Sequence, residues 1–144
     1  MFLVTRRYQF AASHRLHARA LDDEANRRLY GKCNHPFGHG HNYIVEVTAR
    51  GPADASTGAA VDPRRLDELV AREVLDPFDH RDLNRDVDAF RDLTPTSENL
   101  AVEICRRMKR GWPTMFPGEW PQLEKVRIAE TARNIFEMNA HEIQ

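Results

Sequence analysis

Hydrophobic and polar residues alternate along several segments of the chain, as they do in β-strands with one buried face. Between residues 2 and 14, one face of such a strand is apolar, and His14 ends the row. Residues 39–50 alternate in the same way. Two further alternating segments, 123–130 and 135–138, lie near the C-terminus. The pattern therefore predicts two strands at each end of the chain.

Helical signals lie in the interval between residues 14 and 123. Asp22 fits an N-cap and Gly31 a C-cap, so they predict the two ends of a short helix. Asp62 followed by Pro63 predicts the start of a longer helix, which we expect to end before Pro77.

A short strand ending near Val61 is expected just before that helix. A further helix is predicted to begin at Thr96-Ser97-Glu98, and Cys105 lies on its apolar face, as a core residue would. The basic run 106–110 is expected to close this helix, where cations complement the helix dipole.

The order strand, strand, helix, helix, strand, strand predicts an α+β fold with an antiparallel sheet. The 144 residues and 41% hydrophobic content fit one domain spanning 1–144. A net charge of −1 gives no reason to expect a nucleic-acid or membrane partner. Two cysteines and no long apolar run at the N-terminus favour a reduced, cytoplasmic protein.

Three histidines form a candidate metal site. His39 and His41 lie two residues apart at the start of a predicted strand, so both imidazoles lie on one face. An adjacent strand would bring His14 beside them. Three histidines with one open position are typical of a catalytic zinc site. Taken alone, the spacing favours polar strand ends exposed to water.

A nucleophile and a proton relay are suggested near these histidines. Cys33 lies beside Lys32 in a glycine-rich loop, and cationic neighbours or a metal lower the pKa of a thiol. Cys33 therefore fits a thiolate base, although a small buried hydrophobe is the alternative. Asp79-His80 fits a proton relay, or else a turn aspartate beside an exposed histidine.

Glu130 ends an apolar row, where a carboxylate must be exposed, paired or functional. It can accept two parallel N–H bonds from an aminopyrimidinone edge. The structural alternative is an ion pair with Arg127 or Arg133.

Four ordered stretches together resemble the 6-pyruvoyltetrahydropterin synthase family, and the resemblance covers nearly the whole chain. The first is "FAASHRLHARALDDEANRRLYGKCNHPFGHGHNY", and the others are "LDPFDHRDLN", "PTSENLAVEI" and "ETARNIF". Four blocks in the correct order are far more specific than any one of them. At the matched positions, the resemblance favours the functional interpretations over the structural ones.

The resemblance implies roles for individual residues. It implies zinc ligands at His14, His39 and His41, a proton-accepting Cys33, the pair Asp79 and His80, and a pterin-binding Glu130. Thr96, Ser97 and Glu98 fall where the family lines its pterin pocket. The remaining histidines, His17, His35 and His141, have no counterpart role.

The resemblance also implies a fold and an assembly. The expected fold is a tunnelling fold (T-fold), a four-stranded antiparallel sheet with two helices on one side. Three subunits would close a barrel, and two trimers would stack into a homohexamer with active sites between subunits.

The implied activity is that of a zinc-dependent lyase converting 7,8-dihydroneopterin triphosphate to 6-pyruvoyltetrahydropterin and triphosphate, in tetrahydrobiopterin biosynthesis. An alternative is the related 6-carboxytetrahydropterin synthase of queuosine biosynthesis, which also releases acetaldehyde. Five residues between Cys33 and His39 favour the pyruvoyl branch. A non-catalytic pterin-binding zinc protein is a third interpretation, but it would have no use for a base at Cys33.

Overall fold

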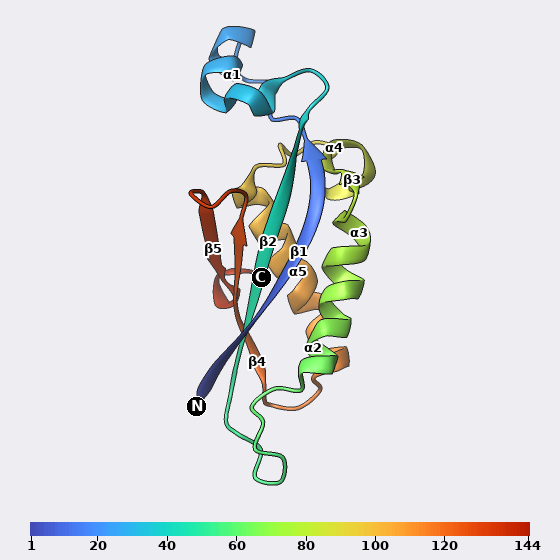
Figure 1. Cartoon of the computed structure of the whole chain (residues 1–144), viewed down its shortest axis with the longest axis vertical. Helices are drawn as coiled ribbons and strands as arrows, with labels where there is room; N and C mark the ends of the chain where they lie inside the picture. Colours follow the sequence, from blue (N-terminus) through green and yellow to red (C-terminus); the bar gives the residue numbers. More distant parts are fainter.

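The computed structural model describes all residues from Met1 to Gln144. A long antiparallel sheet carries its main helices on one face (Figure 1). The strands are β1 (Phe2–His14), β2 (His39–Gly51), β3 (Arg81–Asp82), β4 (Gln122–Ala129) and β5 (Ile135–Asn139). The α-helices are α1 (Asp23–Tyr30), α2 (Pro63–Val70), α3 (Asp76–Phe78), α4 (Leu83–Asp86) and α5 (Ser97–Met115). A π-turn (Ala71–Leu75) and 3₁₀ turns (Gly31–Asn34, Asp88–Phe90, Ala140–Glu142) complete the chain.

The sheet has the strand order β3-β1-β2-β4-β5. Strands β1, β2, β4 and β5 pair antiparallel, which confirms the predicted α+β class and the four long strands. The short β3 adds a fifth strand, parallel to β1 at Ala12 and Ser13, so the four-stranded prediction was incomplete. Two residues are too short to show a period, and the sequence therefore gave no sign of this strand.

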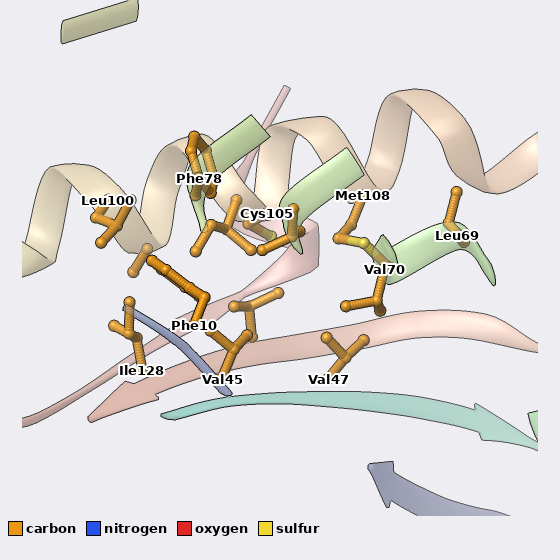
Figure 2. Packing of buried hydrophobic residues seen from close by; sticks show 14 of the residues in the cluster. Phe10, Val45, Val47, Leu69, Val70, Phe78, Leu100, Cys105, Met108 and Ile128 are labelled. Carbon is orange, nitrogen blue, oxygen red and sulfur yellow. The ribbon is translucent and has the colours of Figure 1, made fainter. Parts of the chain in front are cut away.

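The core lies between the sheet and the helices. Figure 2 shows Leu100 and Met108 of α5 facing side chains that rise from the strands, among them Phe10, Val45 and Ile128. All five are at most 1% exposed. Cys105 is fully buried in the same cluster, as predicted. The helices therefore cover one face of the sheet, and the row that includes Phe10 leads along that face to His14.

Both long helices run further than the sequence predicts. The helix that starts at Pro63 does not end before Pro77, because the π-turn at Ala71–Leu75 leads directly into α3. Pro77 lies in the first turn of α3, where a backbone N–H donor is not needed. The basic run does not close α5, because Trp112 continues the buried stripe and holds the helix to Met115.

The strand expected near Val61 is absent, and residues 52–61 form an irregular loop. Asp54 organises this loop by accepting hydrogen bonds from the backbone N–H groups of Ser56 and Thr57. A turn held by its own side chains satisfies the backbone without a strand partner. No helix of the chain is long and apolar enough to cross a membrane.

Strand register brings the candidate site together at one end of the sheet. His14, the last residue of β1, pairs with His39, the first residue of β2. On the other side of β2, Ile44 pairs with Ala129, the last residue of β4. The segment containing α1 and the following 3₁₀ turn stands above this end (Figure 1). Residues from β1, the 3₁₀ turn, β2 and the end of β4 therefore meet there.

Candidate active site

Four side chains converge at this end of the sheet. His14, Cys33, His41 and Glu130 each direct one potential ligand atom to a common point, and these atoms lie within 4.8 Å of one another. The Nε2 atoms of His14 and His41 are 3.1 Å apart. A set of imidazole nitrogens, a sulfur and a carboxylate oxygen at these spacings suits a divalent transition-metal cation.

The imidazole of His14 is held in one orientation. Its Nδ1 lies 2.9 Å from the backbone oxygen of Pro95, and a carbonyl oxygen can only accept, so Nδ1 carries the proton. Nε2 therefore presents its lone pair to the other three groups. His14 is 1% exposed, and burial lowers its pKa, which keeps the ring neutral as metal binding requires.

His41 lies between the other groups of the cluster. Its Nε2 is 3.1 Å from Glu130 Oε1 and 3.5 Å from Cys33 Sγ. Burial lowers the pKa of His41 more strongly than the Glu130 carboxylate raises it, so this ring also tends to be neutral. Tyr43, two residues further along the same face of β2, places its hydroxyl 3.2 Å from Nδ1 of His14.

His39 lies beside this cluster and not inside it. Its ring centroid is 4.7 Å from that of His41, but its nitrogens are not among the four converging ligand atoms. Its side chain also lines a polar cavity on the α1 side. The role of His39 as a third metal ligand therefore stays a prediction.

Cys33 lies in the 3₁₀ turn after α1, and its backbone oxygen accepts a hydrogen bond of 2.7 Å from the N–H of Leu16. Its Sγ is 4.0 Å from Glu130 Oε1. Burial, followed by the Glu130 carboxylate, raises the pKa of the thiol. The expectation that Lys32 lowers this pKa was wrong, because Lys32 is exposed and does not contact the sulfur. A cation held by the histidines would act in the opposite direction.

Glu130 uses both carboxylate oxygens. Oε1 faces His41, and Oε2 accepts a hydrogen bond of 2.5 Å from the hydroxyl of Ser97. The alternative of an ion pair with arginine was wrong: Arg127 lies 3.6 Å from Glu46, and neither Arg127 nor Arg133 contacts Glu130. A partly buried carboxylate without a permanent cationic partner is therefore available to a ligand.

The segment Thr96-Ser97-Glu98 contributes unequally to the site. Ser97 is buried and bonded to Glu130. Thr96 caps α5 by accepting a hydrogen bond from the N–H of Asn99, which gives it a structural function. Glu98 is exposed, and no hydrogen bond or ion pair joins it to the cluster.

Asp79 and His80 lie at the β3 edge of the sheet. Oδ1 of Asp79 accepts a hydrogen bond of 2.9 Å from Ala11 N–H on β1, and Oδ2 is 3.0 Å from His80 Nδ1. The Ala11 N–H, together with His80, lowers the pKa of Asp79. The His80 side chain is 82% exposed. No hydrogen bond or ion pair within the chain joins Asp79 or His80 to Cys33.

Sequence reasoning missed several groups that shape the site. Tyr43 follows His41 at strand spacing, so its place on the same face could have been foreseen from the period of two. The contact of the Pro95 carbonyl with His14 could not be predicted, because every residue carries a backbone carbonyl and the sequence does not show which one lies near the site. Gly38 has φ +83°, and a Cβ there would lie 2.9 Å from the backbone oxygen of His14, so the loop before β2 requires glycine.

Comparison with known proteins gives consistent results. The profile of the family described as 6-pyruvoyl tetrahydropterin synthase matches residues 3–141. A 6-pyruvoyl tetrahydrobiopterin synthase from Poecilia reticulata is 45% identical, over 92% of this chain and 86% of its own. The Homo sapiens protein of the same name is 42% identical, over 92% of this chain and 87% of its own.

Among solved structures, a 6-pyruvoyl tetrahydropterin synthase from Caenorhabditis elegans superimposes with a TM-score of 0.83 and is 38% identical. The superposition covers 96% of this chain and 94% of that one. Both the sequence and the arrangement of the sheet and helices are therefore similar over nearly the full length.

Proposed function

The chain belongs to the 6-pyruvoyl tetrahydropterin synthase family and is a lyase, and we propose that it converts 7,8-dihydroneopterin triphosphate to 6-pyruvoyltetrahydropterin and triphosphate. The observation that carries this proposal is the convergence of His14, Cys33, His41 and Glu130 within 4.8 Å. These four positions combine metal ligands, a base and a carboxylate in one place, as the reaction requires.

The proposed metal is Zn²⁺, held by His14, His39 and His41. The neutral, oriented imidazole of His14 supports this donor set, because ring N–H groups bonded to a carbonyl are typical of zinc sites. When bound, zinc would supply Lewis-acid polarisation of the oxygen atoms on the substrate side chain.

Cys33 is the proposed base, and Glu130 the proposed anchor for the pterin ring. Sγ lies beside the metal ligand His41, so a side chain held over the metal would present its C–H bonds to the sulfur. The hydrogen bond from Ser97 leaves lone pairs on both oxygens of Glu130 for ring N–H groups. Anchoring the ring would fix the reacting carbons relative to Cys33.

We propose that the active protein is a homohexamer of two stacked trimers. The outer edges of β1 and β5 lack strand partners over most of their length, which favours pairing with another copy. Phe2 is 57% exposed, Leu3 60% and Ile135 44%, so apolar side chains lie along both edges. Head-to-tail pairing of the two edges would bring Asp79 and His80 of one subunit toward Cys33 of the next.

Product identification tests the reaction. The zinc-loaded protein should convert 7,8-dihydroneopterin triphosphate to a pyruvoyl pterin and inorganic triphosphate, identified by mass. A carboxy pterin with acetaldehyde would show instead that the protein is the 6-carboxytetrahydropterin synthase. Pterin binding without turnover would show a non-catalytic protein and contradict the proposal. We propose the cytoplasm as the site of this activity, since both cysteines are free thiols.

Replacing Glu130 with Gln should weaken pterin binding about ten- to a hundredfold, the equivalent of about 1.5–3 kcal/mol. The substitution keeps the size of the side chain but turns one acceptor into a donor that would face a ring N–H. Titration with a dephosphorylated pterin measures the change.

Metal content should stay at the wild-type level in Glu130→Gln, since Glu130 is not one of the proposed ligands. Glu137→Gln, an exposed position on β5, is the matched control and should bind the pterin normally. Wild-type affinity in Glu130→Gln would remove Glu130 from the pterin pocket.

A further inference from the structure

A polar cavity of about 760 Å³ lies between α1, the following 3₁₀ turn and the loop before β2. No hydrophobic side chain lines it. This part of the chain stands above the end of the sheet that carries the candidate site (Figure 1). The charged and imidazole side chains of its wall are Arg15, Asp23, Arg27, Lys32, His35 and His39.

The wall of this cavity carries an excess of positive charge. Arg15, Arg27 and Lys32 are permanent cations, and Asp23 is the one carboxylate among the lining residues. Several arginines elsewhere in the protein form an ion pair with a carboxylate within 4.0 Å. Arg15, Arg27 and Lys32 form no such pair. Three cations without an ion-pair partner around a polar cavity attract a polyanion.

Arg15 is held in place while the end of its side chain stays free. Its Nε donates to the backbone oxygen of Asn34 at 3.2 Å. The side chain of Asn84 accepts from the Arg15 backbone N–H at 2.7 Å and donates to the Arg15 backbone oxygen at 3.0 Å. No protein acceptor contacts the two terminal nitrogens of the guanidinium. A fixed guanidinium with free terminal N–H groups suits two-point binding of a phosphate.

The cavity adjoins the candidate active site. His39 lines the cavity, and its ring lies 4.7 Å, centroid to centroid, from that of His41 in the four-residue cluster. Lys32 directly precedes Cys33. A molecule whose reacting carbons lie at Cys33 and His41 would therefore reach the cavity with a substituent of a few atoms.

We propose that this cavity is the subsite for the triphosphate chain of the substrate and for the triphosphate product, with Arg15 as the fixed ligand and Arg27 and Lys32 as flanking cations. Asn84 is a positioning residue, because it acts through the backbone of Arg15. The assignment rests on the proposed function, since it takes the triphosphate ester as the substrate. It adds the residues that would distinguish a triphosphate ester from a shorter phosphate ester.

A second cavity beside Arg15 is a weaker candidate. It measures about 380 Å³ and also contains Arg19 and Arg91. Arg91 is already paired with Asp88 at 2.7 Å, and none of His39, His41 and Cys33 lines this space. Its charge is partly compensated, and it does not open beside the reacting groups.

Inhibition of the zinc-loaded enzyme by inorganic tripolyphosphate tests the assignment. Arg27→Gln and Lys32→Gln should each raise the tripolyphosphate inhibition constant about tenfold, since each removes a charged ligand of the anion. Both side chains are exposed, so folding should be unaffected. The affinity for a dephosphorylated pterin and the zinc content should stay at wild-type levels in both variants.

Arg28→Gln is the matched control, because Arg28 adjoins Arg27 on α1 and does not line the cavity. It should be inhibited like the wild type. Unchanged inhibition in both Arg27→Gln and Lys32→Gln, with normal wild-type turnover, would overturn the subsite and leave the proposed reaction intact. Weakened binding of tripolyphosphate to these variants, measured by direct titration, with no turnover by the wild type, would support the anion site and overturn the reaction.

Discussion

Replacing Cys33 with Ala should lower turnover by about 10²–10⁴-fold while the fold and the zinc content stay unchanged. The thiol is the proposed base, and no other group at the convergence point can replace it. His14 and His41 are proposed to bind the metal. Glu130 accepts a hydrogen bond from Ser97 and is proposed to bind the pterin ring. Single-turnover kinetics with metal analysis measures both quantities.

His41→Ala is the comparison that separates the base from the metal. His41 lies at the centre of the cluster, 3.1 Å from both His14 Nε2 and Glu130 Oε1, so its loss should remove zinc and activity together. Cys33→Ala should remove activity alone. Sγ lies only 3.5 Å from His41 Nε2, so a ligand role for the thiol is testable in the same experiment. Stoichiometric loss of zinc in Cys33→Ala would make Cys33 a ligand and contradict its assignment as the base.

Much of the fold could be predicted because its long strands each have one buried face. The alternation that leads to His14 and the alternation that starts at His39 gave two strands whose bounds agree with the structure within one residue. The helix ends were less predictable. Pro77 predicts a helix end, yet the π-turn at Ala71–Leu75 lets the helix continue past it. The formation of this π-turn depends on packing and not on the local helix preference of the sequence.

The site could be predicted where its residues share a strand or a short loop. His14, His41 and Cys33 meet as expected, because register and a tight turn follow from local sequence. The pKa of Cys33 could not be predicted, because it depends on burial and on Glu130, which approaches from a distant strand. The hydroxyl of Ser97 reaches Glu130 only through the packing of α5 on the sheet, which sequence periodicity alone does not position.

Asp79 and His80 pose a different problem, because no hydrogen bond or ion pair within the chain joins them to Cys33. The carboxylate of Asp79 is held on β1 by the Ala11 N–H, and the exposed His80 has φ 59°, a backbone conformation that costs energy in a non-glycine residue. A strained, exposed histidine beside a fixed carboxylate, outside the four converging side chains, is explained if a neighbouring subunit completes the site.

Mixing two inactive variants should therefore restore activity. Asp79→Asn keeps an oxygen to accept the Ala11 N–H but removes the charge, and it should lower turnover about as strongly as Cys33→Ala. If each site takes Cys33 from one subunit and Asp79 from the next, random reassembly of equal amounts places both wild-type residues in about one quarter of the sites. The mixture should then reach about one quarter of wild-type activity.

Each variant is also dissociated and reassembled alone as a control, and native mass spectrometry of differently tagged subunits verifies that mixed oligomers have formed. The two separate preparations should stay inactive. Mixed oligomers that are as inactive as the single variants would mean that each site uses Cys33 and Asp79 from the same chain. Asp79 and His80 would then act on Cys33 of their own chain from the β3 edge, where the hydrogen bond to Ala11 holds Asp79. Restored activity would show that the next subunit supplies the pair, as the free strand edges allow.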